Sequence, residues 1–120
     1  MDLFIKNNKI QQYYISDELK STTNYKNITL CIDSYTYNNL STIFMGIYSL
    51  KDIKLIKNHK GSKFIYWSGE DANITIDNNL KLINLIKSID IIKHIAENKL
   101  VQYNLNNVGI QTEKIGRAHV

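Results

Sequence analysis

The sequence predicts an α/β fold, a Rossmann-like parallel sheet with helices on both faces. Short apolar runs rich in β-branched residues alternate with segments in which apolar residues recur at helical spacing. This alternation of strand and helix is typical of βαβ units, whose strands are parallel. The chain has 120 residues, of which 43% are hydrophobic and 22% charged, and this is enough for one domain with a core.

Four segments are predicted to form the strands of this sheet. They are Ile28–Asp33, Lys63–Trp67, Asp90–Ile95 and Gly109–Lys114. The run Lys9–Ile15 is a further strand candidate, and Asp17–Lys26 has the composition of a turn or loop. Cys31 lies within the first apolar run, so we expect it in the core.

Three helices are predicted between these strands. The first contains Leu40, Ile43, Phe44 and Ile47, and Leu50, Ile53 and Ile56 continue it or begin another. The second contains Leu82, Ile83, Ile86 and Ile89, with Asp77 or Asn78 as its cap. The third spans Glu97–Val108, with Glu97 in the first turn and Gly109 at the C′ position.

Composition excludes several classes of protein. A single cysteine excludes a disulfide framework and a multi-cysteine metal site, and no His or Cys pair has metal-ligand spacing, so we expect no metal. No apolar run is long enough to cross a membrane, and a cytoplasmic location is the expectation. The net charge of +4 raises the possibility of nucleic-acid binding, but the lysines are dispersed and Arg117 is the only arginine. We therefore expect no nucleic-acid partner.

The two ends of the chain differ from its middle. Residues 1–27 form a poorly defined N-terminal segment, whereas residues 28–114 carry the predicted Rossmann-like domain. The last six residues, 115–120, back-translate codon for codon to a short-read sequencing adapter. We interpret them as an artefact, so the natural protein is expected to continue beyond Lys114.

The carboxyl ends of the predicted strands are the expected ligand site, because parallel α/β sheets bind ligands there. This rule selects residues 33–37, 67–71 and 94–98. In the second group Trp67 could stack on a sugar ring, while Glu70 and Asp71 could accept hydrogen bonds from sugar hydroxyls. The second and third groups have structural alternatives: a strand-ending turn with an interior Trp67 for the second, and a core His94 with Glu97 as a helix-start acid for the third. His59 is expected at the surface.

Three motifs carry a family resemblance. A polar loop Asp33-Ser34-Tyr35 follows a strand, and the turn Ser68-Gly69-Glu70-Asp71 follows Tyr66-Trp67. The segment 91–101 leads to Val108-Gly109-Ile110 and Glu113-Lys114. This order resembles the N-terminal Rossmann domain of GT-B-fold glycosyltransferases of the group 1, family 4 type. The composition, rich in Asn, Ile and Lys, is most similar to that of the glycosyltransferases of large DNA viruses. Ser68 stands where that family often has His, and Ala96 where Ser is common.

The resemblance implies that the chain is a partial GT-B N-terminal domain, the acceptor-side part of an enzyme that transfers a sugar from a nucleotide-sugar to an acceptor. A missing C-terminal domain would bind the donor, so the fragment alone is expected to be inactive. The resemblance implies that the enzyme needs no cofactor, and it identifies no catalytic residue in this chain. The implied substrate-binding residues are Trp67, Ser68, Gly69, Glu70, Asp71, His94, Glu97 and Asn98. The alternative is a non-catalytic α/β module that binds a nucleotide or a protein.

Overall fold

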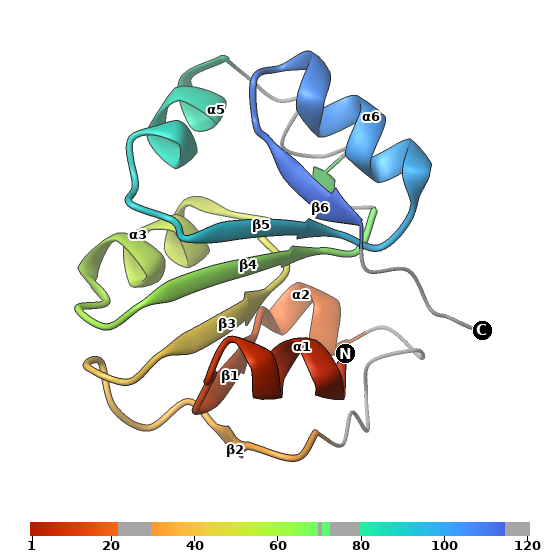
Figure 1. Ribbon diagram of the computed structural model, residues 1–120. Coiled ribbons are helices and arrows are strands. Elements are labelled where there is room, and N and C mark those ends of the chain that lie inside the picture. Colours follow the sequence, from red (N-terminus) through yellow and green to blue (C-terminus); the bar gives the residue numbers. More distant parts are fainter. Residues whose placement is uncertain (22–29, 70, 73–79, 115–120) are drawn as a thin grey trace.

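The computed structural model describes residues 1–21, 30–69, 71–72 and 80–114. Its helices are α1 (Asp2–Asn7), α2 (Asp17–Lys20), α3 (Leu50–Asn58), α5 (Leu80–Lys87) and α6 (Lys99–Asn107). Its strands are β1 (Gln12–Ile15), β2 (Asp33–Ser34), β3 (Thr42–Met45), β4 (Lys63–Trp67), β5 (Lys93–Ala96) and β6 (Thr112–Lys114). Figure 1 shows the strands as one sheet that runs through the molecule.

The six strands form one sheet in the order β2-β1-β3-β4-β5-β6, and every neighbouring pair is parallel. The predicted α/β class with a parallel Rossmann-like sheet is therefore confirmed. The chain leaves β1 for β2 on one side and returns to β3 on the other, so the strand order reverses between β1 and β3. Such a reversal is the topological switch point of a doubly wound sheet.

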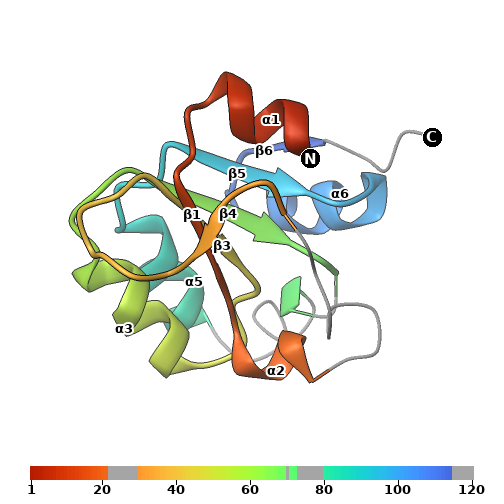
Figure 2. The same ribbon diagram turned by 90° about the horizontal axis from the view of Figure 1, so that it is seen from below.

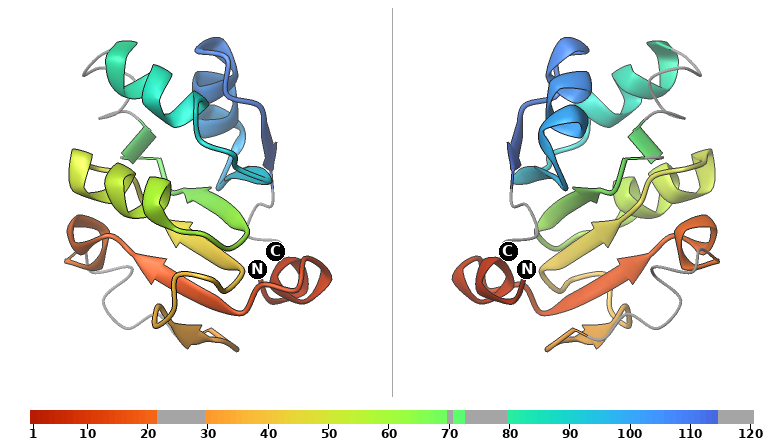
Figure 3. Two further views of the ribbon diagram at one scale, coloured as in Figure 1. Left: turned by 90° about the vertical axis from the view of Figure 1, so that its left-hand side faces the viewer. Right: turned by 90° about the vertical axis from the view of Figure 1, so that its right-hand side faces the viewer.

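Both faces of the sheet are covered. Phe44, Ile65 and Trp67 pack with side chains of α3, α5 and α6 on one face. Ile43, Phe64 and Tyr66 pack with Ile5 of α1 and Leu19 of α2 on the other. In Figure 2, α1 lies on one side of the sheet, and α3 and α5 lie on the other. The end-on views in Figure 3 show the same separation of α1 from α3.

The second half of the chain folds as the sequence predicts. The strand Lys63–Trp67 is β4 with the predicted bounds, and α6 and β6 lie within their predicted segments. Strand β5 overlaps the predicted strand Asp90–Ile95 but begins at Lys93 and ends one residue later, at Ala96. Gly109 follows the C-cap of α6 with a φ of +88°, the left-handed conformation expected at C′. Helix α5 carries the predicted apolar face with Ile83 and Ile86 buried, while its predicted caps Asp77 and Asn78 lie outside the described residues.

The predicted helix through Leu40 and Ile47 is wrong, because residues 42–45 form strand β3. All four of its side chains are buried, with Phe44 on one face of the sheet and Ile43 on the other. A strand buried on both faces has no polar alternation, so its apolar residues matched helical spacing by coincidence. Gly46, with a φ of +89°, then separates the strand from α3, where Ile53 and Ile56 are buried.

The early part of the chain also differs from the prediction. The segment read as a turn or loop after residue 16 begins with helix α2. Residues 28 and 29 of the run predicted as a buried strand, 28–33, lie outside the described residues. Of the described part only Asp33 is in a strand, the two-residue edge strand Asp33–Ser34, whose pairing partners are Gln12 and Tyr13. Cys31 is exposed and not in the core. Strand β2 lies at the sheet edge, and both of its residues are exposed.

Among the described helices none is long and apolar enough to cross a membrane. The longest, α3 and α6, have nine residues each. A span of the hydrocarbon core needs about 20 residues.

Candidate functional site

The carboxyl ends of β4 and β5 bring two of the predicted groups together. The strands are in register with Trp67 opposite Ala96, and the Glu97 N–H donates to the Trp67 carbonyl over 3.1 Å. Residues 68–69 and 97–98 therefore leave the same edge of the sheet side by side. A Cβ placed on Gly69 would lie 3.5 Å from Cγ2 of Val101, so the turn after β4 rests against α6.

The turn after β4 is organised by the Asp71 carboxylate. Its Oδ1 accepts hydrogen bonds from the Ser68 N–H and hydroxyl at 3.0 Å, from the Gly69 N–H at 2.9 Å and from the Ala72 N–H at 3.0 Å. Gly69 has a φ of +127°, which side chains other than hydrogen rarely tolerate. This is the strand-ending turn that the sequence allowed. Glu70 lies outside the described residues.

Asp71 is fully buried, and its second carboxylate oxygen, Oδ2, has no hydrogen-bond partner among the described residues. Burial raises the pKa of Asp71 from 3.8 to about 6, although the four donors on Oδ1 act in the opposite direction. Desolvation outweighs these hydrogen bonds because it opposes the charged form of the whole carboxyl group. Asp71 therefore holds the turn together from inside and is not positioned to meet a ligand.

The start of α6 supplies the accessible groups of this edge. Asn98 is the N-cap, and its Oδ1 accepts from the Val101 N–H over 3.0 Å. The predicted position of Glu97 in the first turn is wrong, because Glu97 precedes the N-cap. Glu97, Ser68 and Gly69 are half-buried and Asn98 is exposed. These four residues can meet a ligand at the sheet edge.

Trp67 has no exposed surface, so its ring offers no face for a sugar. Its indole N–H donates to Nδ1 of His94 over 3.1 Å, and the two rings lie 6.2 Å apart, inclined by 24°. Because the indole nitrogen can only donate, Nδ1 is the acceptor and the neutral ring carries its proton on Nε2. Burial lowers the pKa of His94 from 6.5 to about 4, which keeps the ring neutral at pH 7.

His94 belongs to a different part of the sheet from the other predicted site residues. It is the second residue of β5 and it borders a pocket at the amino end of that strand. Residues 33–37 also lie apart from the edge formed by 68–69 and 97–98. The Thr36 and Tyr37 N–H groups donate to Oε1 of Gln12, the first residue of β1.

The prediction of a surface His59 is wrong, because the side chain is only 3% exposed. The Tyr35 hydroxyl lies 2.8 Å from Nδ1, and Nε2 lies 2.6 Å from the Leu40 carbonyl. A carbonyl can only accept, so Nε2 carries the proton and Nδ1 accepts from Tyr35. Burial lowers the pKa of His59. Lysine neighbours in the sequence suggested exposure, but the loop before β3 covers the ring.

Sequence reasoning missed a buried cluster at the switch point. The Ser16 N–H donates to the Met45 carbonyl over 3.0 Å, which joins the ends of β1 and β3. Asp52, 1% exposed, directs Oδ2 toward this point and accepts from the Tyr48 N–H at 2.9 Å and the Ser16 hydroxyl at 3.1 Å. A helix start at a switch point commonly binds phosphate. Here a carboxylate of the chain occupies the position of the anion.

Within the part of the chain that the structure describes, no three His, Cys, Asp or Glu side chains lie close enough to hold a metal ion. No protein-family model, no curated protein and no solved structure matches the chain.

Proposed function

We propose that the chain is the acceptor-side domain of a glycosyltransferase that uses a nucleotide-sugar donor. The observation that carries the proposal is the hydrogen bond between the Glu97 N–H and the Trp67 carbonyl, which sets two predicted ligand groups on one sheet edge. Ligands of parallel α/β sheets bind at this edge. The resemblance of the sequence motifs to GT-B N-terminal domains supports the choice of a sugar as the ligand.

The accessible groups of this edge suit sugar hydroxyls. The Ser68 hydroxyl donates a hydrogen bond to Asp71. Its oxygen can therefore accept a hydrogen bond from a ligand. Glu97 adds a carboxylate, whose hydrogen bonds with hydroxyls are charge-assisted. Under this proposal Asp71 positions Ser68 and Gly69, and Trp67 supports the turn from the core. The chain binds the acceptor, and a second domain binds the nucleotide-sugar, so no catalytic residue is assigned here.

The burial of Trp67 and Asp71 favours a second candidate, a non-catalytic α/β module. A sugar site usually offers an aromatic face, and neither side chain is accessible at this edge. Within this second candidate a protein partner is favoured over a nucleotide, because the buried Asp52 carboxylate repels a phosphate at the switch point.

Titration of the ¹⁵N-labelled chain with neutral monosaccharides separates the two candidates. Glucose, mannose and N-acetylglucosamine at millimolar concentration are expected to shift the amide signals of Gly69, Glu97 and Asn98. The Glu97→Gln variant should weaken this response about threefold to tenfold, since a charge-assisted hydrogen bond is lost. Glu113→Gln, the same change on β6, is the matched control. Signals that stay unmoved at this edge would contradict the acceptor-side proposal and favour the module.

A further inference from the structure

The net positive charge of the chain is concentrated in one stretch, residues 53–69. The whole chain has 15 basic and 11 acidic residues, and this stretch holds four of the basic ones and none of the acidic ones. The remaining basic and acidic residues are equal in number, so the net charge of +4 arises between Asp52 and Glu70. The stretch forms most of α3, the turn after it and strand β4.

Three of these four lysines lie at the amino end of the sheet. Lys57 is in the last turn of α3, Lys60 is exposed in the turn that follows, and Lys63 begins β4. The Lys63 amine lies 3.4 Å from the Lys57 carbonyl. None of the three forms an ion pair with an acid among the described residues. Their charges are therefore available to an anionic partner.

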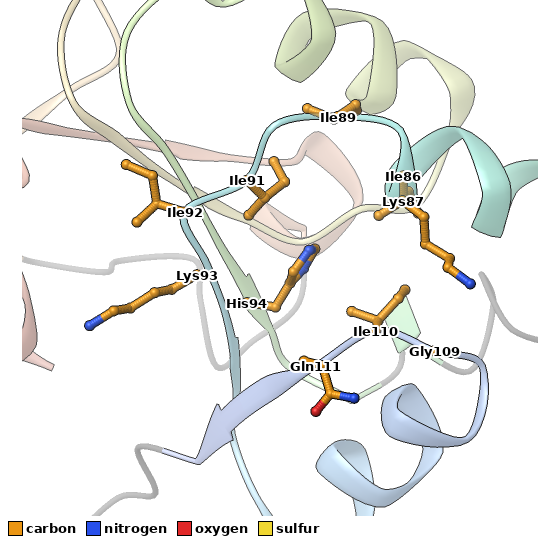
Figure 4. A pocket seen from close by; sticks show the side chains of 10 residues that line it. All are labelled: Ile86, Lys87, Ile89, Ile91, Ile92, Lys93, His94, Gly109, Ile110 and Gln111. Carbon is orange, nitrogen blue, oxygen red and sulfur yellow. The ribbon is translucent and has the colours of Figure 1, made fainter.

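The lysines on either side of this group are paired with acids. Lys51, in the first turn of α3, lies 3.0 Å from a carboxylate of α2. Lys93, the first residue of β5, lies 3.6 Å from the Glu113 carboxylate, and Figure 4 shows its side chain leading away from His94. Asp90, exposed before β5, adds a negative charge on the same side. The basic surface is therefore bounded by compensated charges along the chain in both directions.

An exposed aromatic ring lies beside these lysines. The Asn38 carbonyl accepts from the N–H groups of Lys60 at 2.7 Å and Gly61 at 3.0 Å, so the loop before β3 rests on the turn after α3. Tyr37 precedes Asn38 and is 65% exposed. Its carbonyl accepts from Nε2 of the buried Gln12 at 2.6 Å, and its N–H donates to Gln12 Oε1 at 3.3 Å. The fold thus presents an aromatic ring on a fixed loop, next to positive charge.

We propose that this surface binds single-stranded nucleic acid. Tyr37 stacks on a base, and the amines of Lys57, Lys60 and Lys63 contact backbone phosphates. Stacked rings beside a positively charged track are the usual means of binding single strands without sequence preference. The dispersion of lysines along the sequence predicted no nucleic-acid partner, but the fold sets three of them beside a ring from another segment. The surface lies at the opposite end of the sheet from residues 68–69 and 97–98, so it does not depend on the proposed sugar binding.

An anionic membrane fits this surface less well. Helices that bind at membrane surfaces place large apolar side chains beside their lysines. In the described residues Leu50, Leu80 and Leu100 are exposed, but they stand in the first turns of α3, α5 and α6, away from the turn after α3. The exposed large apolar side chains near the lysines are Tyr37 and Ile92, whose N–H donates to the Lys63 carbonyl over 2.9 Å.

Fluorescence anisotropy of a labelled oligothymidylate about 12 nucleotides long, titrated with the full chain, measures the binding. Three phosphate contacts on a single strand predict that the logarithm of the affinity falls with the logarithm of the salt concentration with a slope of about −2. An affinity that does not respond to salt, or no binding at low salt, would overturn the proposal. Binding to vesicles that contain phosphatidylserine, without binding to the oligonucleotide, would overturn it in favour of a membrane surface.

Tyrosine variants test the stacking contact. Tyr37→Ala should weaken oligonucleotide binding about tenfold, and Tyr37→Phe, which keeps the ring, should retain the affinity. Tyr103→Ala is the matched control, because Tyr103 is 64% exposed on α6 and should change nothing. Equal losses in Tyr37→Ala and Tyr103→Ala, or no loss in Tyr37→Ala, would contradict the assignment of Tyr37.

Lysine variants test the phosphate contacts. The double variant Lys57→Gln, Lys60→Gln should reduce the salt slope from about −2 to about −0.7, because two of three phosphate contacts are lost. The double variant Lys20→Gln, Lys99→Gln removes the same charge from exposed positions on α2 and α6 and should leave the slope unchanged. Circular dichroism confirms that each variant is folded, as expected for exposed side chains. Equal effects of the two double variants would show that net charge alone causes binding, and would overturn the proposal.

Discussion

The Ser16 hydroxyl donates to Oδ2 of Asp52 over 3.1 Å, and this contact fastens the end of β1 to the first turn of α3 across 36 positions of sequence. The same oxygen accepts from the Tyr48 N–H at 2.9 Å and from the Ser49 hydroxyl at 3.4 Å. Asp52 therefore joins the end of β1 to the residues at which α3 begins. Three donors from two segments depend on one buried carboxylate.

Replacing Asp52 by Ala should destabilise the fold strongly. The substitution leaves the Tyr48 N–H and the Ser16 hydroxyl without their acceptor, so we expect a loss of about 2–3 kcal/mol in the free energy of unfolding. Urea denaturation followed by circular dichroism measures it. Asp17→Ala is the control, because its ion pair with Lys51 is exposed to solvent and should contribute little to stability. Equal losses in the two variants would show that burial of Asp52 does not matter.

Gln12 should be the main anchor of the loop before β3. It is fully buried, its Nε2 donates to the Tyr37 carbonyl at 2.6 Å and to Thr42 Oγ1 at 2.7 Å, and its Oε1 accepts from the Thr36 N–H at 3.0 Å. We expect Gln12→Leu to lower the free energy of unfolding by about 3 kcal/mol, because several buried polar groups lose their partner. Gln11→Leu, at the exposed neighbour, should change it by under about 1 kcal/mol. Chemical denaturation of both variants checks the contrast.

Asn98 tests how far the candidate edge depends on its cap. Its Oδ1 accepts from the Val101 N–H, so Asn98→Ala should lower the free energy of unfolding by about 1 kcal/mol. Asn98→Ser restores an acceptor and should recover most of that loss. Hydrogen exchange at Val101 is the local readout, and it should accelerate in the alanine variant alone. Unchanged exchange in Asn98→Ala would contradict the capping role.

The sequence predicted β4 and α6 closely because their signals are local. A β-branched and aromatic run with Gly61 before it specifies Lys63–Trp67, and Gly109 marks the end of α6. It missed β3, since a strand buried on both faces has no alternation to detect. It also missed Asp52, which reads as an ordinary helix residue until the pairing of β1 with β3 brings Ser16 beside it. A contact between residues far apart in the sequence, such as Ser16 and Asp52, produces no periodic pattern from which it could be predicted.

Buried titratable groups are expected to give opposing pH dependences of stability. Asp71 has a pKa raised by burial from 3.8 to about 6, so its contribution is present below pH 3.8 and is lost as pH rises through 6. His94 has a pKa lowered by burial from 6.5 to about 4, so its contribution is present above pH 6.5 and is lost as pH falls through 4. His59, with a pKa also lowered by burial, acts in the direction of His94.

The Asp71→Asn variant should separate these contributions. The introduced amide keeps an Oδ1 acceptor for the donors of Ser68, Gly69 and Ala72, but it does not titrate. The histidines make the folded state more stable as pH rises, and in the variant no loss of stability from Asp71 opposes this increase. We expect the free energy of unfolding of the variant to increase relative to the parent by up to about 3 kcal/mol between pH 4 and 7. Urea titrations across this range measure it. His94→Asn should change the slope in the opposite sense, because a group that favours high pH is removed. Parallel profiles for the parent and Asp71→Asn would mean that folding does not raise the pKa of Asp71, and that the hydrogen bonds on Oδ1 at least balance the desolvation of the carboxylate.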